Sequence, residues 1–232
     1  MAEEPFMLNS EYNLVIVAHP DDESIYMGGL IMQQNKLPWK VICVTDGGAN
    51  GLGKLRSQQF KEACQKLAIT DFQQWNYPDI FEKRLDVKSL TKQLKKLAPP
   101  QNIFTHGVLG EYGHPHHQDV CYAVHSAFEK HDNIYSIAYN CFPELLVTLT
   151  EEEYRRKSEI LGVTYSQEIE RFAHLVPNSF TEGFIRLDPQ EVFSLYRTLT
   201  QYTAVDESSL KDFSWLKKHI EKTLACERQR LF

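Results

Sequence analysis

Two kinds of segment alternate along the chain: short apolar runs, and longer stretches in which apolar residues recur every three or four positions. Short apolar runs next to turn-forming residues are typical of buried strands, and the longer periodic stretches are typical of helices that cover a sheet. The pattern predicts strands at 14–18, 41–45, 102–105 and 134–139, and helices at 24–34, 55–68, 87–97 and 118–128. Because the two kinds alternate, we expect an α/β fold with a mostly parallel sheet flanked by helices.

The last third of the chain has a different pattern, in which helical spacing dominates from Glu151 onward. Its final apolar stripe predicts a helix packed on the core and consists of Phe213, Leu216, Ile220 and Leu224. No internal repeat, low-complexity tract or linker divides the sequence. We therefore expect one domain over residues 1–232, with its core at about 12–170 and a mainly helical part at 171–232.

Charge and cysteine content narrow the class of protein. The formal net charge is −6 at pH 7, which argues against nucleic acid or an anionic membrane surface as the main partner. The five cysteines are scattered and contain no CxxC pair, so we expect reduced thiols. The acidic N-terminus has no apolar leader segment, and no stretch approaches the ~20 apolar residues of a membrane span. These features predict a cytoplasmic protein.

The first candidate site is the segment AHPDDE, which begins where the first predicted strand ends. His19, Asp21 and Asp22 would lie at the carboxyl end of that strand, where open α/β sheets bind their ligands. One Asp could simply cap the following helix. Two adjacent carboxylates repel each other, however, so the complete segment indicates a positive group between them.

A second cluster, THGVLGEYGHPHHQDV at residues 105–120, follows another predicted strand and contains His106, His114, His116 and His117. Zinc in hydrolytic sites commonly takes three protein ligands from histidines and carboxylates and leaves the fourth position to water. His19, Asp22 and one histidine of this second cluster would supply such a set. Two clusters at neighbouring strand ends therefore favour a metal site.

Three motifs carry a resemblance to a known family: AHPDDE, GHPHH about a hundred residues later, and YSQ at residues 165–167. Over about residues 12–170 the chain resembles the PIG-L-like, or LmbE-like, zinc-dependent N-deacetylases. The resemblance implies a Rossmann-like fold and removal of the N-acetyl group from an N-acetylglucosamine-type amino sugar or its conjugate, with no nucleic acid as partner. It also implies that His19, Asp22 and His117 hold Zn²⁺.

The same resemblance implies roles for three other residues. Asp21 would be the general base, His114 would stabilise the oxyanion or protonate the leaving amine, and Arg56 would help bind substrate. The chemistry agrees with this division, because amide hydrolysis needs an activated water, a stabilised oxyanion and a proton for nitrogen. Asp22 could bind the metal while its neighbour Asp21 reaches the water.

The sequence also departs from the family pattern. Many relatives carry Asp where this chain has His116, an acidic residue where it has Gly48, and Glu where it has Gln59. None of these changes affects the implied zinc ligands. We therefore expect that His116 can be replaced by alanine without loss of metal, whereas the protonation state of His114 should differ from that in relatives with Asp. For His106, contact with substrate and a structural role are both open.

Two alternative functions remain at this point. The segment Gly48–Lys54 fits the pattern G-x-x-x-x-G-K of a P-loop, between a predicted strand and a predicted helix. A P-loop needs Ser or Thr next to hold magnesium, but this chain has Leu55. A non-catalytic sugar-binding module is the second alternative; because a module that only binds needs no base, Asp21 argues against it.

Overall fold

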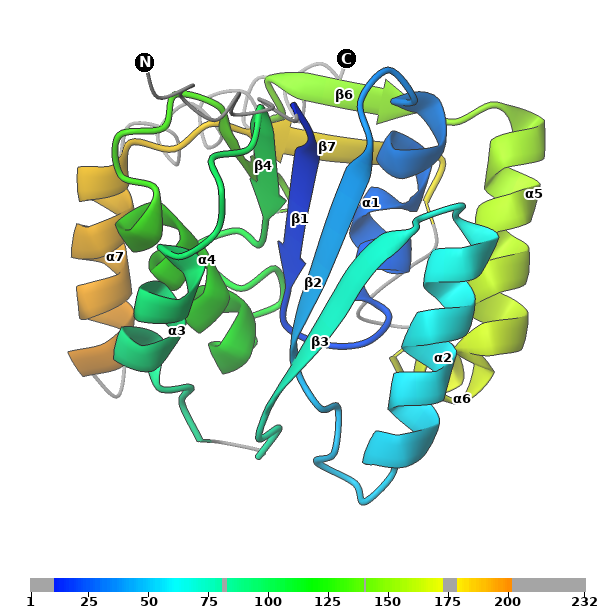
Figure 1. Ribbon diagram of the computed structural model, residues 1–232, viewed down its shortest axis with the longest axis horizontal. Helices are drawn as coiled ribbons and strands as arrows, with labels where there is room; N and C mark the ends of the chain where they lie inside the picture. Colours follow the sequence, from blue (N-terminus) through cyan, green and yellow to red (C-terminus); the bar gives the residue numbers. More distant parts are fainter. Residues whose placement is uncertain (1–10, 81–82, 140, 173–178, 202–232) are drawn as a thin grey trace, which may run out of the picture.

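The computed structural model describes residues 11–80, 83–139, 141–172 and 179–201, which build a seven-stranded sheet with helices on both faces (Figure 1). In spatial order the strands are β3 (Asp71–Tyr77), β2 (Trp39–Thr45), β1 (Asn13–Val17), β4 (Asn102–Thr105), β5 (Ile134–Ile137), β7 (Thr181–Ile185) and β6 (Leu145–Thr148). The first five run parallel to one another. β7 is antiparallel to β5, and β6 is antiparallel to β7. The expected α/β, Rossmann-like fold is therefore confirmed.

The helices form two layers (Figure 1). One layer contains α1 (Asp22–Gln33), α2 (Gly53–Lys66), α5 (Glu151–Glu159), the π-helical turn η1 (Ile160–Thr164) and α6 (Ser166–Phe172). The other contains α3 (Val87–Leu94), α4 (Pro115–Ala127) and α7 (Pro189–Gln201). Two apolar clusters, one on each face of the sheet, join these layers to it.

β1 lies in the middle of the sheet, and its side chains alternate between the two apolar clusters. Val15 and Val17 pack with α1 and α2, whereas Leu14 and Ile16 pack with α3 and α4. All four side chains are completely buried. A strand that is buried on both faces reads as an unbroken apolar run, which is why the sequence predicts it well.

The expected elements are present, with ends that shift by a few residues, but three strands were missed. β3 was overlooked because its sequence, DFQQWNY, is mostly polar, as suits a strand at the edge of the sheet. β6 and β7 are short and lie beyond the parallel part of the sheet. β7 falls within the region that was expected to be mainly helical. The predicted stripe of Phe213, Leu216, Ile220 and Leu224 lies outside the described residues.

The order of the strands in the sheet reverses at β1: β2 and β3 are added on one side of it, and β4 and β5 on the other. This reversal positions the site. From β1 the chain enters α1 on one face of the sheet, whereas from β4 it enters α4 on the other face (Figure 1). Such a switch point opens a crevice at the carboxyl ends of the two strands. His19 follows β1 and His106 follows β4, so both histidines line this crevice. Among the described helices, none has the length and apolarity that crossing a bilayer requires.

Candidate functional site

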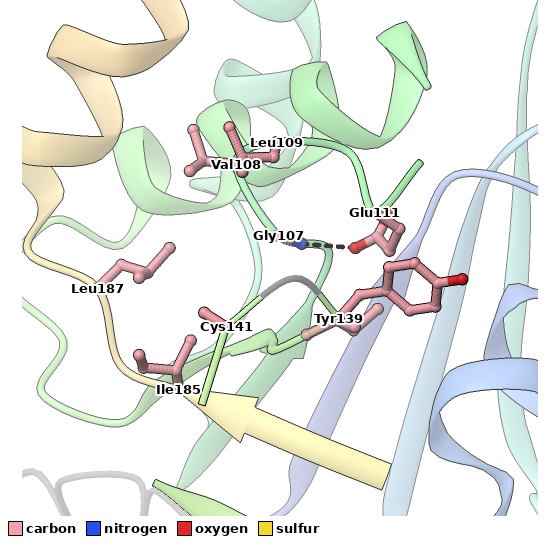
Figure 2. A pocket seen from close by; sticks show the side chains of 9 residues that line it. Gly107, Val108, Leu109, Glu111, Tyr139, Cys141, Ile185 and Leu187 are labelled. Atoms are coloured by element: carbon pink, nitrogen blue, oxygen red, sulfur yellow. Dashed lines mark hydrogen bonds between the residues drawn. The ribbon is translucent and has the colours of Figure 1, made fainter. Parts of the chain in front are cut away.

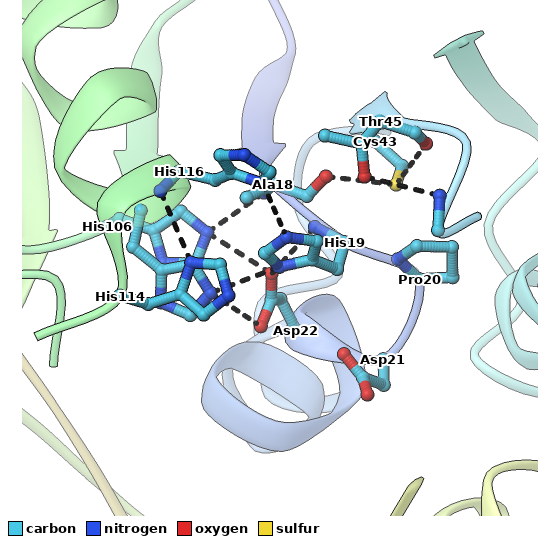
Figure 3. A network of polar contacts seen from close by, with 12 residues as sticks. Ala18, His19, Pro20, Asp21, Asp22, Cys43, Thr45, His106, His114 and His116 are labelled. Carbon is cyan, nitrogen blue, oxygen red and sulfur yellow. Dashed lines mark hydrogen bonds and ion pairs between the residues drawn. The ribbon is translucent and has the colours of Figure 1, made fainter. Parts of the chain in front are cut away.

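The turn after β1 folds the His19 and Asp22 side chains toward each other (Figure 3). The backbone N–H of His19 donates to Asp22 Oδ2 at 2.8 Å, and the N–H of Asp22 donates to the His19 carbonyl at 3.3 Å. His19 Nδ1 then lies 3.4 Å from Asp22 Oδ2. Asp22 is the first residue of α1, so the positive end of the helix dipole also favours its carboxylate form.

The start of α4 brings the second cluster to the same place. Gly110 has φ of +70°, and a Cβ there would lie 2.5 Å from the His114 carbonyl, so the tight turn before the helix requires glycine. Pro115 begins α4 and directs His117 toward β1. His117 Nε2 lies 3.5 Å from Asp22 Oδ1 and 3.2 Å from His19 Nδ1.

Glu111 determines which nitrogen of His117 faces the site. Its carboxylate lies 2.5 Å from His117 Nδ1 and 3.1 Å from His106 Nδ1. Burial opposes ionisation of Glu111, but His106 and His117 outweigh it and lower the pKa of the carboxyl to about 2. An ionised carboxylate can only accept, so His117 Nδ1 carries the proton and Nε2 carries a lone pair. That lone pair faces Asp22.

The expected ligand atoms are therefore together and fit a metal ion. His19, Asp22 and His117 each offer one atom to a buried group whose members lie within 4.8 Å of one another. His19 Nδ1 lies 3.2 Å from His117 Nε2 and 3.4 Å from Asp22 Oδ2, and His117 Nε2 lies 3.5 Å from the other carboxylate oxygen, Asp22 Oδ1. Each distance is close to the edge of a tetrahedron with metal–ligand bonds of about 2.1 Å, which is about 3.4 Å. The His117 Nε2 lone pair and the Asp22 carboxylate that face each other at 3.5 Å repel unless a cation lies between them.

Asp21 is held apart from this group on a strained backbone (Figure 3). Its φ of 119° is a conformation that residues other than glycine seldom adopt. Its Oδ2 lies 3.1 Å from Arg56 Nη2, which also donates to the Pro20 carbonyl. Burial raises the pKa of Asp21 to about 8, against the opposite effect of the Arg56 guanidinium. A buried carboxyl with a pKa near neutrality suits proton transfer.

The YSQ motif supports the backbone at Asp21. The hydroxyl of Tyr165 donates to Glu23 Oε1 at 2.9 Å, and Glu23 Oε2 accepts from the Asp21 N–H at 3.1 Å. Glu23 and Tyr165 are completely buried. Residues 142 positions apart in the chain therefore hold Asp21 in its strained conformation.

Arg56 lies beside Asp21, and its guanidinium already contacts carboxylates of the protein. Its guanidinium is buried, with Nη2 at Asp21 and Nη1 3.1 Å from Glu168 Oε1. The expected contact of Arg56 with substrate stays a prediction. Its present contacts direct its charge at Asp21.

His114 is the N-cap of α4, and its ring lies over the metal-ligand group. The backbone N–H of His116 donates to His114 Nδ1 at 3.2 Å, so Nδ1 carries the lone pair and Nε2 the proton. The ring centroids of His19 and His117 lie 4.5 and 4.6 Å from that of His114. Burial lowers the pKa of His114, and the neighbouring histidines lower it further. His114 is therefore a neutral hydrogen-bond donor at the edge of the site.

The remaining two histidines, His106 and His116, lie outside the expected set of metal ligands. His106 is completely buried, with Nε2 accepting from the Ala18 N–H at 2.9 Å and Nδ1 at Glu111, which assigns it a structural place behind the site. His116 was expected to leave the metal ligands untouched. Its Nδ1 instead lies 3.1 Å from His19 Nε2.

The sequence did not reveal Glu111, Asp79 or Glu168 as members of the site. Glu111 lies within the quoted histidine segment, but its place depends on a loop with positive φ at Gly110 and Glu111. Asp79 follows β3, the strand that the apolar pattern missed. Asp79 and Glu111 are both carboxylates in the loop that follows a strand, β3 and β4 respectively. That position is the signal by which the sequence could have indicated them.

The segment Gly48–Lys54 comprises part of the loop after β2 and the first two residues of α2, but it does not form a phosphate cradle. The N–H of Gly48 donates to Asp46 Oδ1 at 2.9 Å, and the N–H of Gly51 donates to the Gly48 carbonyl at 2.9 Å. Asp46 Oδ1 also accepts from the Asp79 N–H at 3.0 Å. Because a carboxylate already occupies this position, the P-loop alternative is not favoured.

Two pockets border this region of the sheet. The smaller one, of about 20 Å³, is lined by Gly107 and Glu111 from the loop after β4, by Tyr139 from the segment after β5, and by Ile185 at the end of β7 (Figure 2). The N–H of Gly107 donates to Glu111 Oε1 at 2.8 Å across its wall. The larger one, of about 280 Å³, lies between α1 and β7 and has Tyr26 and Tyr139 in its wall. The Tyr26 ring separates it from His106 and His117, with centroid distances of 6.2 and 6.3 Å.

Comparison with known proteins adds the family. The family model described as PIG-L: GlcNAc-PI de-N-acetylase matches residues 14–128. An uncharacterised protein of Acanthamoeba polyphaga mimivirus is 30% identical over 151 residues, covering 57% of this chain and 65% of that protein. The N-acetylglucosaminyl-phosphatidylinositol de-N-acetylase of Saccharomyces cerevisiae is 31% identical over 129 residues, covering 49% of this chain and 42% of the yeast protein. The chain thus spans about two thirds or less of the length of these relatives.

A solved structure agrees in fold. The N,N'-diacetylchitobiose deacetylase from Pyrococcus horikoshii superposes with a TM-score of 0.53 at 19% identity, over 78% of this chain and 85% of that one. The matched residues 14–128 contain both segments that form the site, AHPDDE and GHPHH. By sequence match and by fold, the chain is a PIG-L-like, or LmbE-like, protein.

Proposed function

We propose that this protein is a zinc-dependent amidohydrolase that removes the N-acetyl group from an N-acetylglucosamine-type amino sugar or its conjugate. The observation that carries the proposal is the convergence of His19 Nδ1, His117 Nε2 and the Asp22 carboxylate, with Asp21 directly before Asp22 in the chain. Two nitrogens and a carboxylate are the ligand set of hydrolytic zinc, and the adjacent carboxyl supplies a base.

The metal and the base would divide the chemistry. Zn²⁺ bound to these three residues would act as a Lewis acid toward the amide carbonyl and would lower the pKa of water. Asp21 accepts the proton of the attacking water. Its strained backbone and its contacts with Arg56 and Glu23 hold the carboxylate still, so that little reorganisation is needed when the proton moves.

Of the two roles expected for His114, the geometry favours stabilisation of the oxyanion. Its Nδ1 accepts a backbone N–H, so Nε2–H is available to donate to the oxygen of the tetrahedral centre. The lowered pKa keeps the ring neutral before the reaction, which suits a hydrogen-bond donor better than a stored acid. The proton for the leaving amine then comes from Asp21, which has taken it from water.

The substrate class follows from the relatives. The family description and the yeast relative name N-acetylglucosaminyl-phosphatidylinositol, and the Pyrococcus protein is named for diacetylchitobiose. N-acetylglucosamine is common to both. We therefore propose a small-molecule sugar or glycoconjugate as substrate. We also propose Arg56, which lies beside Asp21, as a substrate-binding residue, and a cytoplasmic location.

The test is acetate release from a panel of N-acetylglucosamine conjugates by zinc-loaded protein. We expect release from at least one conjugate, loss of release after chelation, and recovery when Zn²⁺ is added back. His117→Ala should lose most of its zinc by elemental analysis, since it removes one of three ligands. Full zinc occupancy in that variant would remove His117 from the site, and turnover of nucleoside triphosphates alone would favour the P-loop function.

A further inference from the structure

His116 occupies a position that ties the metal-ligand group to the loop after β3. Its side chain is buried, and each of its two ring nitrogens lies within hydrogen-bond distance of a partner. Nε2 lies 2.7 Å from the backbone carbonyl of Lys83. Nδ1 lies 3.1 Å from His19 Nε2, as Figure 3 shows. Asp79 Oδ1 lies 3.3 Å from His116 Nδ1 and 3.7 Å from His19 Nε2.

The protons on these rings follow from the fixed acceptor at one end. A carbonyl oxygen only accepts, so the proton of a neutral His116 is on Nε2 and its Nδ1 carries a lone pair. His19 Nε2 faces that lone pair and is therefore the donor. The lone pair of His19 is then on Nδ1, the nitrogen that faces Asp22 and His117.

We propose that His116 is a positioning residue for the metal ligand His19, and that Asp79 assists it. This proposal rests on the metal site of the proposed function, and it assigns a role to His116, which was expected to leave the metal ligands unaffected. The hydrogen bond to His116 fixes which nitrogen of His19 points at the metal and prevents rotation of the ring. Asp79 Oδ1, 3.7 Å from His19 Nε2, is too far to accept a hydrogen bond from it, but its negative charge favours a proton on that nitrogen and so makes His19 a stronger ligand through Nδ1.

The arrangement is the counterpart of the one at His117. There Glu111 accepts the proton of Nδ1 and leaves Nε2 for the metal, whereas here His116 accepts the proton of Nε2 and leaves Nδ1. Each histidine ligand thus has an acceptor on the side away from the metal. Without one, the ring could present either nitrogen, and half of its neutral forms would direct an N–H at the metal position.

Zinc affinity is the measurement, made by competition with a chromophoric chelator on full-length protein at fixed pH. His116→Ala removes the acceptor and should weaken zinc binding about 10–100-fold. His116→Gln retains an oxygen that can accept from His19, so its affinity should stay within about threefold of wild type. His131→Ala is the matched control, since His131 contacts Pro100 and Asn133 and no residue of the site. Asp79→Asn should show a smaller loss than His116→Ala.

The outcomes separate the two proposals. Wild-type affinity in His116→Ala would overturn the positioning role while zinc binding and acetate release by wild type leave the proposed function intact. Equal losses in the Ala and Gln variants would also overturn it, since they would indicate a structural role without a specific hydrogen bond. A wild-type protein that binds no zinc would overturn both.

A second measurement does not depend on a variant that folds. In zinc-loaded wild-type protein labelled with ¹⁵N-histidine, long-range ¹H–¹⁵N spectra report which ring nitrogen carries the proton. We expect the proton of His19 on Nε2 and that of His116 on Nε2. A His19 ring with its proton on Nδ1 would mean that the metal binds the opposite nitrogen, and the positioning role would be wrong.

Discussion

Glu111 lies 2.5 Å from His117 Nδ1, on the side of the ring that faces away from Asp22. The same carboxylate accepts from the Gly107 N–H at 2.8 Å. A negative acceptor fixed in this way is compatible with only one neutral form of His117 when Asp22 is on the other side of the ring. In that form Nδ1 carries the proton and Nε2 carries the lone pair. Metal-bound histidines commonly have such a partner, and its loss weakens metal binding.

Replacement of Glu111 by glutamine should therefore act through His117. The Gln oxygen would accept from Gly107, so its NH₂ group would point at His117 Nδ1 and favour the ring form with the proton on Nε2. We expect zinc affinity to fall about 10–100-fold. The measurement is chelator competition, with the exposed Glu152→Gln as control. An unchanged affinity would show that His117 does not depend on Glu111 for its orientation.

Asp21→Asn should separate chemistry from metal binding. Asp21 belongs to none of the candidate metal groups, so the variant should retain its zinc. Turnover should fall by about a hundredfold or more, because an amide cannot take a proton from water. Elemental analysis and acetate release are measured on the same preparation, with Asp132→Asn as the surface control. If zinc content falls together with turnover, Asp21 and Asp22 have exchanged roles.

Sequence reasoning was most successful where burial determines the pattern. The run Leu14–Val17 is apolar because β1 is covered on both faces, and its end places His19, Asp21 and Asp22 in the crevice. At the edge of the sheet that signal is lost. β3 exposes alternate residues to solvent, so it carries polar side chains and was missed, and Asp79 beyond its end was missed with it.

The orientation of the histidine rings could not be predicted from sequence. Spacing places His114, His116 and His117 at the start of one helix, but which nitrogen each ring presents depends on acceptors far away in the chain. His116 takes its acceptor from Lys83, 33 positions earlier. The sequence therefore did not indicate that His116 Nδ1 lies 3.1 Å from His19 Nε2.

A buried ion pair outside the site should dominate the stability of the α1 layer. Lys157 is completely buried, with Nζ 2.7 Å from Glu182 Oε1, and Glu182 also accepts from the Gly29 N–H at 2.7 Å. Lys157→Met leaves the buried carboxylate without a counter-charge, which should cost about 3–5 kcal/mol in the free energy of unfolding. The Lys157→Met, Glu182→Gln double variant should recover part of that loss.

Urea denaturation measures both variants, and the chain offers a matched exposed pair. Arg186 Nε lies 3.3 Å from Glu144 Oε2, with both side chains about half exposed. Arg186→Met should change the free energy of unfolding by less than about 1 kcal/mol, because solvent screens the interaction. A Lys157→Met loss as small as that of Arg186→Met would mean that Glu182 is fully stabilised by backbone N–H groups.

The last prediction concerns His125, a buried histidine of α4 that is separate from the candidate metal groups. Its Nδ1–H donates to the Cys121 carbonyl at 2.9 Å, and Nε2 has no hydrogen-bond partner in the described part of the chain. Burial lowers its pKa to about 4, whereas in the unfolded chain the pKa returns to about 6.5. Between these values the unfolded state binds the extra proton, so the free energy of unfolding rises with pH across this window and falls as the solution is acidified.

His125→Leu removes this titration and should flatten the pH dependence. For pKa values of about 4 and 6.5, the wild type should lose about 1.3 kcal/mol more than the variant on going from pH 7.5 to pH 5.5. Urea denaturation at the two pH values, in the same buffer ions, gives the difference. His131→Leu is the control, because it changes a partly exposed histidine and should leave the pH dependence of wild type in place. Parallel pH dependences for wild type and His125→Leu would mean that the proton enters the folded state at His125, as it would if water reached Nε2.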